Sequence, residues 1–345
     1  MQSVTKLGLA LSGGGAKGAY HAGVVRYLAE KNIQPDAVAG ASIGALNGAV
    51  VASATDIHQA TKDLEKVWRF VADKSPVKVD SVAIMVLLLR MLLQFGTGPK
   101  GKAASLGLDV LKPVLPEKYK KYLDDVALLE NAPSIDILEK YARLEADDDG
   151  LPFWVSAYRS DGAFTDVVKY LKAELTFSDT KDSDFIFMNA LPQEDKLRAL
   201  LASSAIPVAY ERQSLDGVKY SDGGLGGVKT AQGNTPITPL IEHEKCSHII
   251  VTHLQDGSMW DRHRFPEATI LEIRPSGIAK DGVRDLLKFE KSAIMDWMHQ
   301  GYEDTKATIE ALGYALESFA SRKSAVRRLE RSVGDMAHAL DWLKK

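Results

Sequence analysis

Short apolar runs bounded by glycine alternate with helix-like segments near the start of the chain. Residues 7–11 form one apolar run and residues 33–39 form a second. Between these runs, Val24, Val25 and Leu28 are spaced as on one face of a helix. Short buried strands separated by helices are typical of a parallel sheet. We therefore expect residues 7–11 and 33–39 to be parallel strands, each followed by a helix.

Later apolar runs have the length and the β-branched or aromatic content of strands. They are residues 153–158, 185–188, 218–221 and 248–252, with 270–273 as a candidate edge strand. Helical spacing is found at residues 56–70 and 195–203. The second of these helices must end before Pro207, because the residue preceding a proline disfavours helical geometry. The pattern predicts an α/β fold.

The C-terminal region has a different, purely helical pattern. After Pro275 the chain contains no proline, and apolar residues recur at spacings of three and four. The repeat passes through Ile309, Leu312, Leu316 and Phe319, then resumes from Val326 to Leu343 in a phase shifted by three residues. This spacing favours a helical hairpin or an oligomer-forming coil. A basic middle keeps a membrane-surface helix as the alternative; its residues are Arg322, Lys323, Arg327, Arg328 and Arg331.

Composition narrows the class of protein. The chain has 345 residues, 45% hydrophobic and 26% charged, as in ordinary soluble domains. Its formal net charge of -3 gives no reason to expect nucleic acid. The single cysteine, Cys246, cannot form an internal disulfide, which favours a reducing compartment, the cytoplasm. The longest lipophilic stretch, residues 82–95, is too short to span a bilayer; it is either a core helix or a lid that faces lipid.

Three successive glycines, Gly13-Gly14-Gly15, follow the first predicted strand and lead into the first predicted helix. Such a run lets several backbone N–H groups point into one space, at the positive end of a helix dipole. This concavity can bind a phosphate or a developing oxyanion, and Lys17 could reinforce either. A Walker loop would need Ser or Thr where Gly18 stands, and a dinucleotide site would need its acidic residue later than Asp36. We therefore favour the oxyanion.

A serine follows the second predicted strand in the pattern G-x-S-x-G, as Gly40-Ala41-Ser42-Ile43-Gly44. A serine there can sit on a sharp strand-to-helix turn, and the flanking glycines permit the turn and the close strand–helix approach. Both turns project from the carboxyl edge of a parallel sheet, where ligands bind. A nucleophile beside preorganised donors is what acyl transfer requires.

With these motifs the chain resembles the patatin-like phospholipase family, which pairs a glycine-rich loop and a serine turn with a distant aspartate and uses no catalytic histidine. The three motifs stand here as Gly13-Gly14-Gly15-Ala16-Lys17-Gly18, Gly40-Ala41-Ser42-Ile43-Gly44 and Asp222-Gly223-Gly224. Two further blocks, residues 202–207 and 234–237, also look like the family's, in the same order over residues 5–255. The resemblance implies a three-layer α/β/α sandwich with a mostly parallel sheet. It suggests a catalytic domain over 1–275 with a helical, apolar insertion at about 76–150, followed by a helical region over 276–345.

The resemblance also implies a mechanism. Ser42 would be the nucleophile, Asp222 its base, and the N–H groups of Gly13, Gly14 and Gly15 the oxyanion hole. Because aspartate is a weak base for a serine, its site should be partly desolvated. Six residues would support the site: Lys17, Gly18, Gly40, Gly44, Gly223 and Gly224. The expected substrate is a phospholipid, lysophospholipid or neutral-lipid ester, hydrolysed at a peripheral membrane surface without calcium, another metal or a cofactor.

Other functions stay open at this point. A Ser-His-Asp esterase could use His21, His248 or His253 as its base. The same chemistry could belong to a regulated membrane-degrading effector, a toxin or an antiphage enzyme. A catalytically lapsed lipid-binding scaffold is the non-enzymatic alternative. A homo-oligomer formed through the C-terminal helices is compatible with each of these.

Overall fold

A mixed sheet, mostly parallel, forms the centre of the molecule. The computed structural model describes residues 5–74, 140–142, 150–162, 166, 169–170, 173, 179–205, 213–255, 260–277 and 288–343. Its strands are β1 (Leu7–Leu11), β2 (Ala37–Ala41), β3 (Phe153–Arg159), β4 (Asp184–Phe187), β5 (Gln213–Leu215), β6 (Val218–Asp222), β7 (His248–Thr252) and β8 (Thr269–Ile273). They are ordered β5-β6-β3-β2-β1-β7-β8, with β4 also paired to β3. The five neighbouring strands β3, β2, β1, β7 and β8 pair parallel to one another. β4 and β6 pair antiparallel to β3, and β5 pairs antiparallel to β6.

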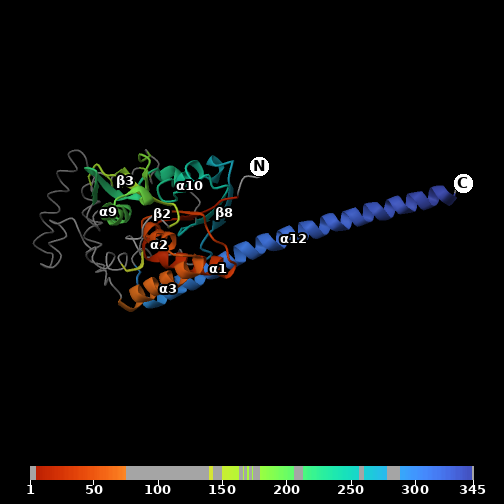
Figure 1. Cartoon of the computed structure of the whole chain (residues 1–345), viewed down its shortest axis with the longest axis horizontal. Coiled ribbons are helices and arrows are strands. Elements are labelled where there is room, and N and C mark those ends of the chain that lie inside the picture. Colours follow the sequence, from red (N-terminus) through yellow and green to blue (C-terminus); the bar gives the residue numbers. More distant parts are fainter. Residues whose placement is uncertain are drawn as a thin grey trace, which may run out of the picture.

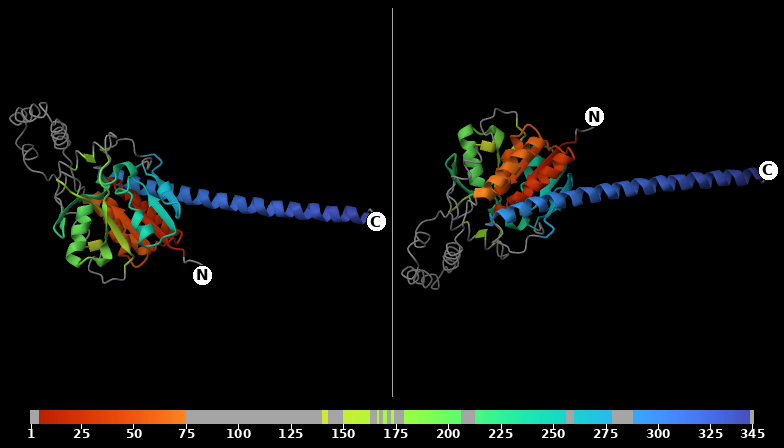
Figure 2. Two further views of the ribbon diagram at one scale, coloured as in Figure 1. Left: turned by 90° about the horizontal axis from the view of Figure 1, so that it is seen from above. Right: turned by 90° about the horizontal axis from the view of Figure 1, so that it is seen from below.

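Helices cover both faces of this sheet (Figures 1 and 2). They are α1 (Ala19–Glu30), α2 (Ile43–Ala52), α3 (Ile57–Lys74), α9 (Gln193–Ser203), α10 (Thr238–Glu242) and α12 (Lys291–Leu343). Because side chains alternate along a strand, Leu9 and Leu11 pack in the core under α1, α2, α3 and α9, while Ala10 packs on the α10 side. The expected α/β/α sandwich with a mostly parallel sheet is confirmed.

The second strand is shorter than its apolar run suggests. We expected a strand over 33–39, but β2 begins only at Ala37. Asn32, with φ 55°, turns the chain out of α1, and the N–H of Ile33 still donates to the carbonyl oxygen of Leu28. Residues 33–36 therefore connect helix to strand, and the Asp36 carboxylate accepts from the N–H of Leu7.

The C-terminal region is a single helix of 53 residues, so the hairpin alternative is wrong. Its first turns pack against α1 at two glycines. A Cβ at Gly23 would lie 2.0 Å from the Met298 carbonyl oxygen, and one at Gly301 would lie 2.0 Å from the Tyr20 carbonyl oxygen. The Tyr20 hydroxyl also donates to Asp304 at 3.0 Å. The C-terminal part of α12 runs away from the body (Figure 1).

Two predictions from the sequence concern residues that the structure does not describe. Residues 82–95, whether lid or core helix, lie outside the described residues, as does nearly all of the insertion expected at 76–150. Among the helices that the structure does describe, none combines the length and the apolar character needed to cross a bilayer.

Candidate active site

Ser42 lies on a sharp turn between β2 and α2. Its backbone has φ 53° and ψ -125°, a conformation that costs about 1–3 kcal/mol outside glycine. The flanking glycines permit it, because a Cβ at Gly40 would lie 2.4 Å from the Gly44 carbonyl oxygen. A Cβ at Gly44 would lie 2.1 Å from the carbonyl oxygen of Leu11. Both glycines are therefore required by the approach of α2 to the sheet.

The turn is held from outside by a residue that the sequence did not single out. The N–H of Ser42 donates to the hydroxyl oxygen of Ser203 at 3.0 Å. Ser203 ends α9 and is fully buried. It stands in the block 202–207, whose resemblance to the family was the only signal for it in the sequence.

The glycine-rich loop lies directly beside Ser42. A Cβ at Gly13 would lie 2.5 Å from the Asn234 Oδ1 and 3.1 Å from the Ser42 Cβ, so a side chain there would have to displace both residues. The N–H of Gly13 donates to the Asn234 carbonyl oxygen at 3.3 Å. Gly15, with φ 56°, then opens the 3₁₀ turn η1 (Gly15–Gly18), which runs into α1. The structure thus brings the loop and the serine together, with the Gly13 N–H already bound.

Lys17 lies in η1 and is buried, with 3% of its surface exposed. Its N–H donates to the Gly14 carbonyl oxygen at 3.3 Å, and the residue makes a further interaction within the protein. This burial fits a residue that supports the loop.

Asp222, at the end of β6, lies close enough to Ser42 for the serine hydroxyl to act on its carboxyl, whose Oδ2 is buried without a hydrogen-bond partner among the described residues. The carboxyl is buried, and burial raises its pKa to about 6, against smaller lowering contributions from the Ser42 hydroxyl and the Gly224 N–H. Its Oδ1 accepts the N–H of Gly224 at 2.8 Å. Gly223 cannot carry a side chain, since its Cβ would lie 2.3 Å from the Ser156 carbonyl oxygen. The desolvation that an aspartate base requires is present.

Asn234 joins the two halves of the site. Its Oδ1 lies 2.5 Å from where a Gly13 Cβ would stand and 3.0 Å from where a Gly224 Cβ would stand. The asparagine therefore fills the space between the glycine-rich loop and the aspartate turn. The block 234–237 had pointed to this segment, but not to the position of this side chain.

A buried amide links the loop to the helix that carries the serine. Asn47 of α2 donates through Nδ2 to the Gly18 carbonyl oxygen at 2.9 Å and lies 3.1 Å from Nδ1 of His21. Its Oδ1 accepts from the Trp68 indole N–H at 3.1 Å. Asn47 is 2% exposed. Nothing in the sequence pattern distinguishes this asparagine, because its partners come from three separate helical segments.

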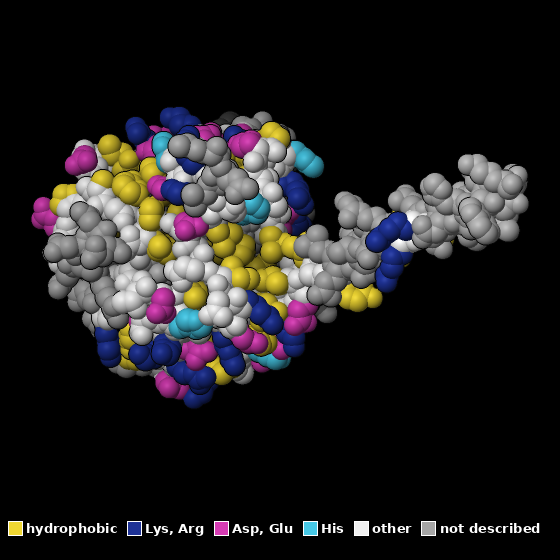
Figure 3. Space-filling view, turned by 45° about the vertical axis from the view of Figure 1, so that its right-hand side comes forward, with side chains coloured by type: hydrophobic (Ala, Val, Ile, Leu, Met, Phe, Trp, Pro, Cys, Tyr) yellow, Lys and Arg dark blue, Asp and Glu magenta, His cyan; other side chains and the backbone are white. Residues whose placement is uncertain are grey.

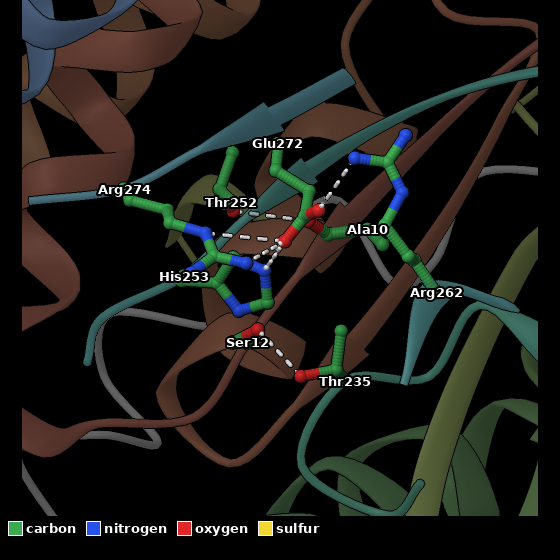
Figure 4. A network of polar contacts seen from close by, with 8 residues as sticks. All are labelled: Ala10, Ser12, Thr235, Thr252, His253, Arg262, Glu272 and Arg274. Atoms are coloured by element: carbon green, nitrogen blue, oxygen red, sulfur yellow. Dashed lines mark hydrogen bonds and ion pairs between the residues drawn. The ribbon is translucent and has the colours of Figure 1, made fainter. Parts of the chain in front are cut away.

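The candidate histidines are engaged elsewhere. Burial lowers the pKa of His21 to about 3, and its Nδ1 lies against Asn47. His248 is exposed, and its Nδ1 lies 3.0 Å from the Ser247 hydroxyl. His253 Nε2 lies 3.0 Å from Glu272, at the carboxyl ends of β7 and β8 (Figure 4).

The Glu272 carboxylate also forms ion pairs with two arginines, Arg262 and Arg274. Burial alone would raise the pKa of Glu272, but hydrogen bonds from His253 and Arg274 and the charge of Arg274 hold it at about 2. Within the described residues, no three metal-binding side chains gather into a possible ion site.

Comparison with known proteins identifies the family. A family model described as patatin-like phospholipase matches residues 9–241, which include both Ser42 and Asp222. The chain belongs to the patatin-like phospholipase family. This confirms the resemblance drawn from the glycine-rich loop, the serine turn and the Asp-Gly-Gly motif.

Curated patatin-like relatives match over short stretches. A patatin-like phospholipase domain-containing protein of Caenorhabditis elegans is 53% identical over 52 residues, 15% of this chain and 5% of that protein. Lysophospholipase NTE1 of Mycosarcoma maydis is 38% identical over 74 residues, 19% of this chain and 4% of that protein. The matched stretches are thus a small part of these long relatives. The crystal structure of VipD from Legionella pneumophila has 15% identity and a TM-score of 0.42, covering 89% of this chain and 67% of that one.

Proposed function

We propose that this patatin-like protein is a serine lipid acyl hydrolase of the phospholipase A or lysophospholipase type, acting through Ser42 and Asp222. The observation that carries the proposal is the meeting of these two residues. A buried carboxyl with a pKa of about 6 faces a serine held on a strained turn. A base poised near neutral pH beside a nucleophile is the arrangement that general-base activation requires.

The reaction has two steps. Asp222 takes the proton of the Ser42 hydroxyl as its oxygen attacks the ester carbonyl carbon. The proton then passes to the leaving alcohol as the ester bond breaks, which leaves the fatty acyl group on Ser42. Asp222 next takes a proton from water, the water oxygen attacks the acyl carbon, and the fatty acid leaves while Ser42 regains its proton.

The glycine-rich loop would stabilise the oxyanion of each tetrahedral intermediate. Because the Gly13 N–H is bound to Asn234, we assign this role to the N–H groups of Gly14 and Gly15. Gly13 then acts by its lack of a side chain, which leaves room beside Ser42. Lys17 and Gly18 would support the loop, and Gly40, Gly44, Gly223 and Gly224 the two turns.

The substrate proposed is the ester of a membrane lipid, so the enzyme would work at a membrane surface while residing in the cytoplasm. The family supports a lipid ester, and the single cysteine, buried with 3% exposed, is compatible with a reducing compartment. The Ser42 hydroxyl acts on the Asp222 carboxyl, and among the described residues no hydrogen bond joins Ser42 to His21, His248 or His253; both points support an aspartate base over a Ser-His-Asp triad.

We also propose self-association through the C-terminal helix α12, where the apolar side chains of Leu312 and Leu329 are exposed. Figure 3 shows hydrophobic and basic side chains on this helix as it leaves the body.

Mass spectrometry of products from a total lipid extract tests this function. The wild type should release free fatty acids and lysolipids from one or a few lipid classes, and Ser42→Ala should leave the extract unchanged. Equal product release by both proteins would contradict the proposal, as would no release by a folded wild type from extracts of several compositions.

A further inference from the structure

The side chain of Asn234 places an uncharged amide between the two halves of the candidate site. A Cβ at Gly13 would lie 2.5 Å from the Asn234 Oδ1 and 3.1 Å from the Ser42 Cβ. A Cβ at Gly224 would lie 3.0 Å from the same Oδ1 and 3.1 Å from the Asp222 Oδ1. One amide oxygen is therefore close to the nucleophile on one side and to the carboxyl on the other.

This amide is free to bind something that is not protein. Within the part of the chain that the structure describes, neither its Oδ1 nor its Nδ2 forms a hydrogen bond. Asn234 is partly exposed and its amide is not enclosed, so water reaches it. The amides of Asn47 and Asn189, in contrast, are hydrogen-bonded at both ends inside the protein. An accessible amide at a catalytic centre can bind substrate or an ordered water.

The backbone of Asn234 has a separate role. Its carbonyl oxygen accepts the N–H of Gly13 at 3.3 Å and so holds the glycine-rich loop. The neighbouring N–H groups of Gly233 and Thr235 donate to the carbonyl oxygens of Gly226 and Ala231. These backbone bonds do not involve the side chain. Removal of the amide therefore leaves the connection between this segment and the loop in place.

The second step of the proposed reaction needs a water at this place. Once Ser42 is acylated, its hydroxyl no longer acts on the Asp222 carboxyl, which becomes available to water. The water must point a lone pair at the acyl carbon while Asp222 takes one of its protons. A second acceptor for its other hydrogen fixes that orientation. The Asn234 Oδ1 is such an acceptor, and an amide oxygen does not compete with Asp222 for the proton.

We propose that Asn234 is a catalytic residue of deacylation, whose Oδ1 holds the attacking water. The water donates one hydrogen bond to Asn234 and one to Asp222. Asp222 removes the proton as the water oxygen bonds to the acyl carbon. The bond from that carbon to the Ser42 oxygen then breaks, and the proton passes from Asp222 to Ser42. This role rests on the proposed hydrolase function and adds the group that orients its water.

Pre-steady-state kinetics with para-nitrophenyl butyrate separate the two steps, because release of nitrophenol reports acylation. Asn234→Ala should release its first nitrophenol at a rate within about threefold of the wild type. It should then lose the butyryl group from Ser42 about tenfold or more slowly, and the acylated protein should accumulate in intact mass spectra. Asn189→Ala, whose amide bonds Leu151 and Phe153, should keep both rates.

The other outcomes of this experiment overturn the proposal. A slowed first step with unchanged deacylation would make the amide a donor to the oxyanion. Equal slowing of both steps would mean that the side chain only fills space, and two unchanged rates would mean that it does not bind the water. A folded wild type that releases no nitrophenol and forms no adduct would instead contradict the hydrolase function itself.

Asn234→Asp tests the position of the amide independently, because it keeps the shape of the side chain. A carboxylate near Asp222 disfavours ionisation of that residue, so the rise of kcat/KM with pH should move upward by about one pH unit. Asn189→Asp should leave the midpoint where it is in the wild type. An unchanged midpoint for Asn234→Asp would show that the amide is not beside the base and would overturn the proposal.

Discussion

The backbone N–H of Ser42 donates to the hydroxyl oxygen of Ser203 at 3.0 Å, across 161 residues of sequence. Because Ser42 adopts φ 53°, its backbone conformation needs support from the surrounding structure. Ser203 provides part of this support from the end of α9. The nucleophile is therefore positioned by a helix that contributes nothing else to the proposed chemistry.

We predict that Ser203→Ala slows the enzyme without touching its reacting atoms. The buried N–H of Ser42 loses its acceptor, which costs about 1–3 kcal/mol of stability and loosens the turn. The rate of covalent labelling by a fluorophosphonate should fall about tenfold or more. Ser204→Ala is the matched control, since among the described residues the Ser204 hydroxyl bonds to two carbonyl oxygens within α9 and not to Ser42. Equal labelling rates for the two variants would contradict the role of Ser203.

The pH dependence of the reaction should follow Asp222. Its carboxyl must be ionised to accept a proton, and burial places its pKa at about 6. The value of kcat/KM should therefore rise through about pH 6 to a plateau, and at pH 5 it should be about a tenth of the plateau. A rate that stays flat from pH 5 to pH 8 would exclude Asp222 as the base.

The same pKa predicts how stability changes with pH. A folded pKa of about 6 exceeds the ordinary value of 3.8, so the folded protein holds this proton more tightly than the unfolded chain. Asp222 thus lowers the free energy of unfolding as pH rises from 4 to 6, by up to about 3 kcal/mol. Asparagine does not titrate. The stability of Asp222→Asn relative to the wild type should therefore increase by about this amount between pH 4 and pH 7.

Urea denaturation of both proteins at pH 4, 5.5 and 7 measures this difference. It needs no activity, so it separates burial of the carboxyl from its catalytic role. A difference that is independent of pH, or that shrinks as pH rises, would contradict the burial of an ionisable carboxyl at this position.

Asn47 should contribute both to the stability of the protein and to the conformation of the glycine-rich loop. Asn47→Ala removes the bond to the Gly18 carbonyl oxygen and leaves the buried Trp68 N–H without its acceptor. We expect a loss of about 2 kcal/mol or more and slower labelling of the protein that remains folded. Asn189→Ala is the control, because Asn189 also bonds two backbone groups, at Leu151 and Phe153, away from the loop. It should lose stability but keep its labelling rate.

Replacement of the histidines should leave the chemistry in place. His253→Gln removes one of the three cationic or hydrogen-bonding partners of Glu272 and should lower stability, since that carboxylate is largely buried. The labelling rate of the folded protein should stay within about twofold of the wild type, because the proposed base is Asp222. A loss of turnover with folding intact, at His253 or at His248, would restore the Ser-His-Asp triad.

The sequence predicted the parts of the fold that depend on local pattern. The strand β7 has the predicted bounds, 248–252, because a short apolar run defines it. The helix α9 ends at the predicted residue, Ser203, because the proline that follows shortly after disfavours a longer helix. The start of β2 was missed, since the left-handed turn at Asn32 is not visible in an apolar run. The straight course of α12 was also undecided, because a phase shift of the apolar row is compatible with a hairpin.

Short sequence motifs predicted only part of the candidate site. The loop, serine and aspartate motifs identified the residues that meet, and the family match spans all three. Ser203, Asn47 and Asn234 were not identified because each acts through contacts with segments distant in sequence. Such contacts depend on how α9 and α2 pack, which no local pattern encodes.

Covalent labelling followed by mass spectrometry of the intact protein tests the central claim most directly. A fluorophosphonate should add one adduct per wild-type chain, at Ser42, with no adduct on Ser42→Ala and a strongly slowed reaction on Asp222→Asn. Labelling of Asp222→Asn at the wild-type rate, or an adduct at another residue, would contradict a serine nucleophile activated by this aspartate.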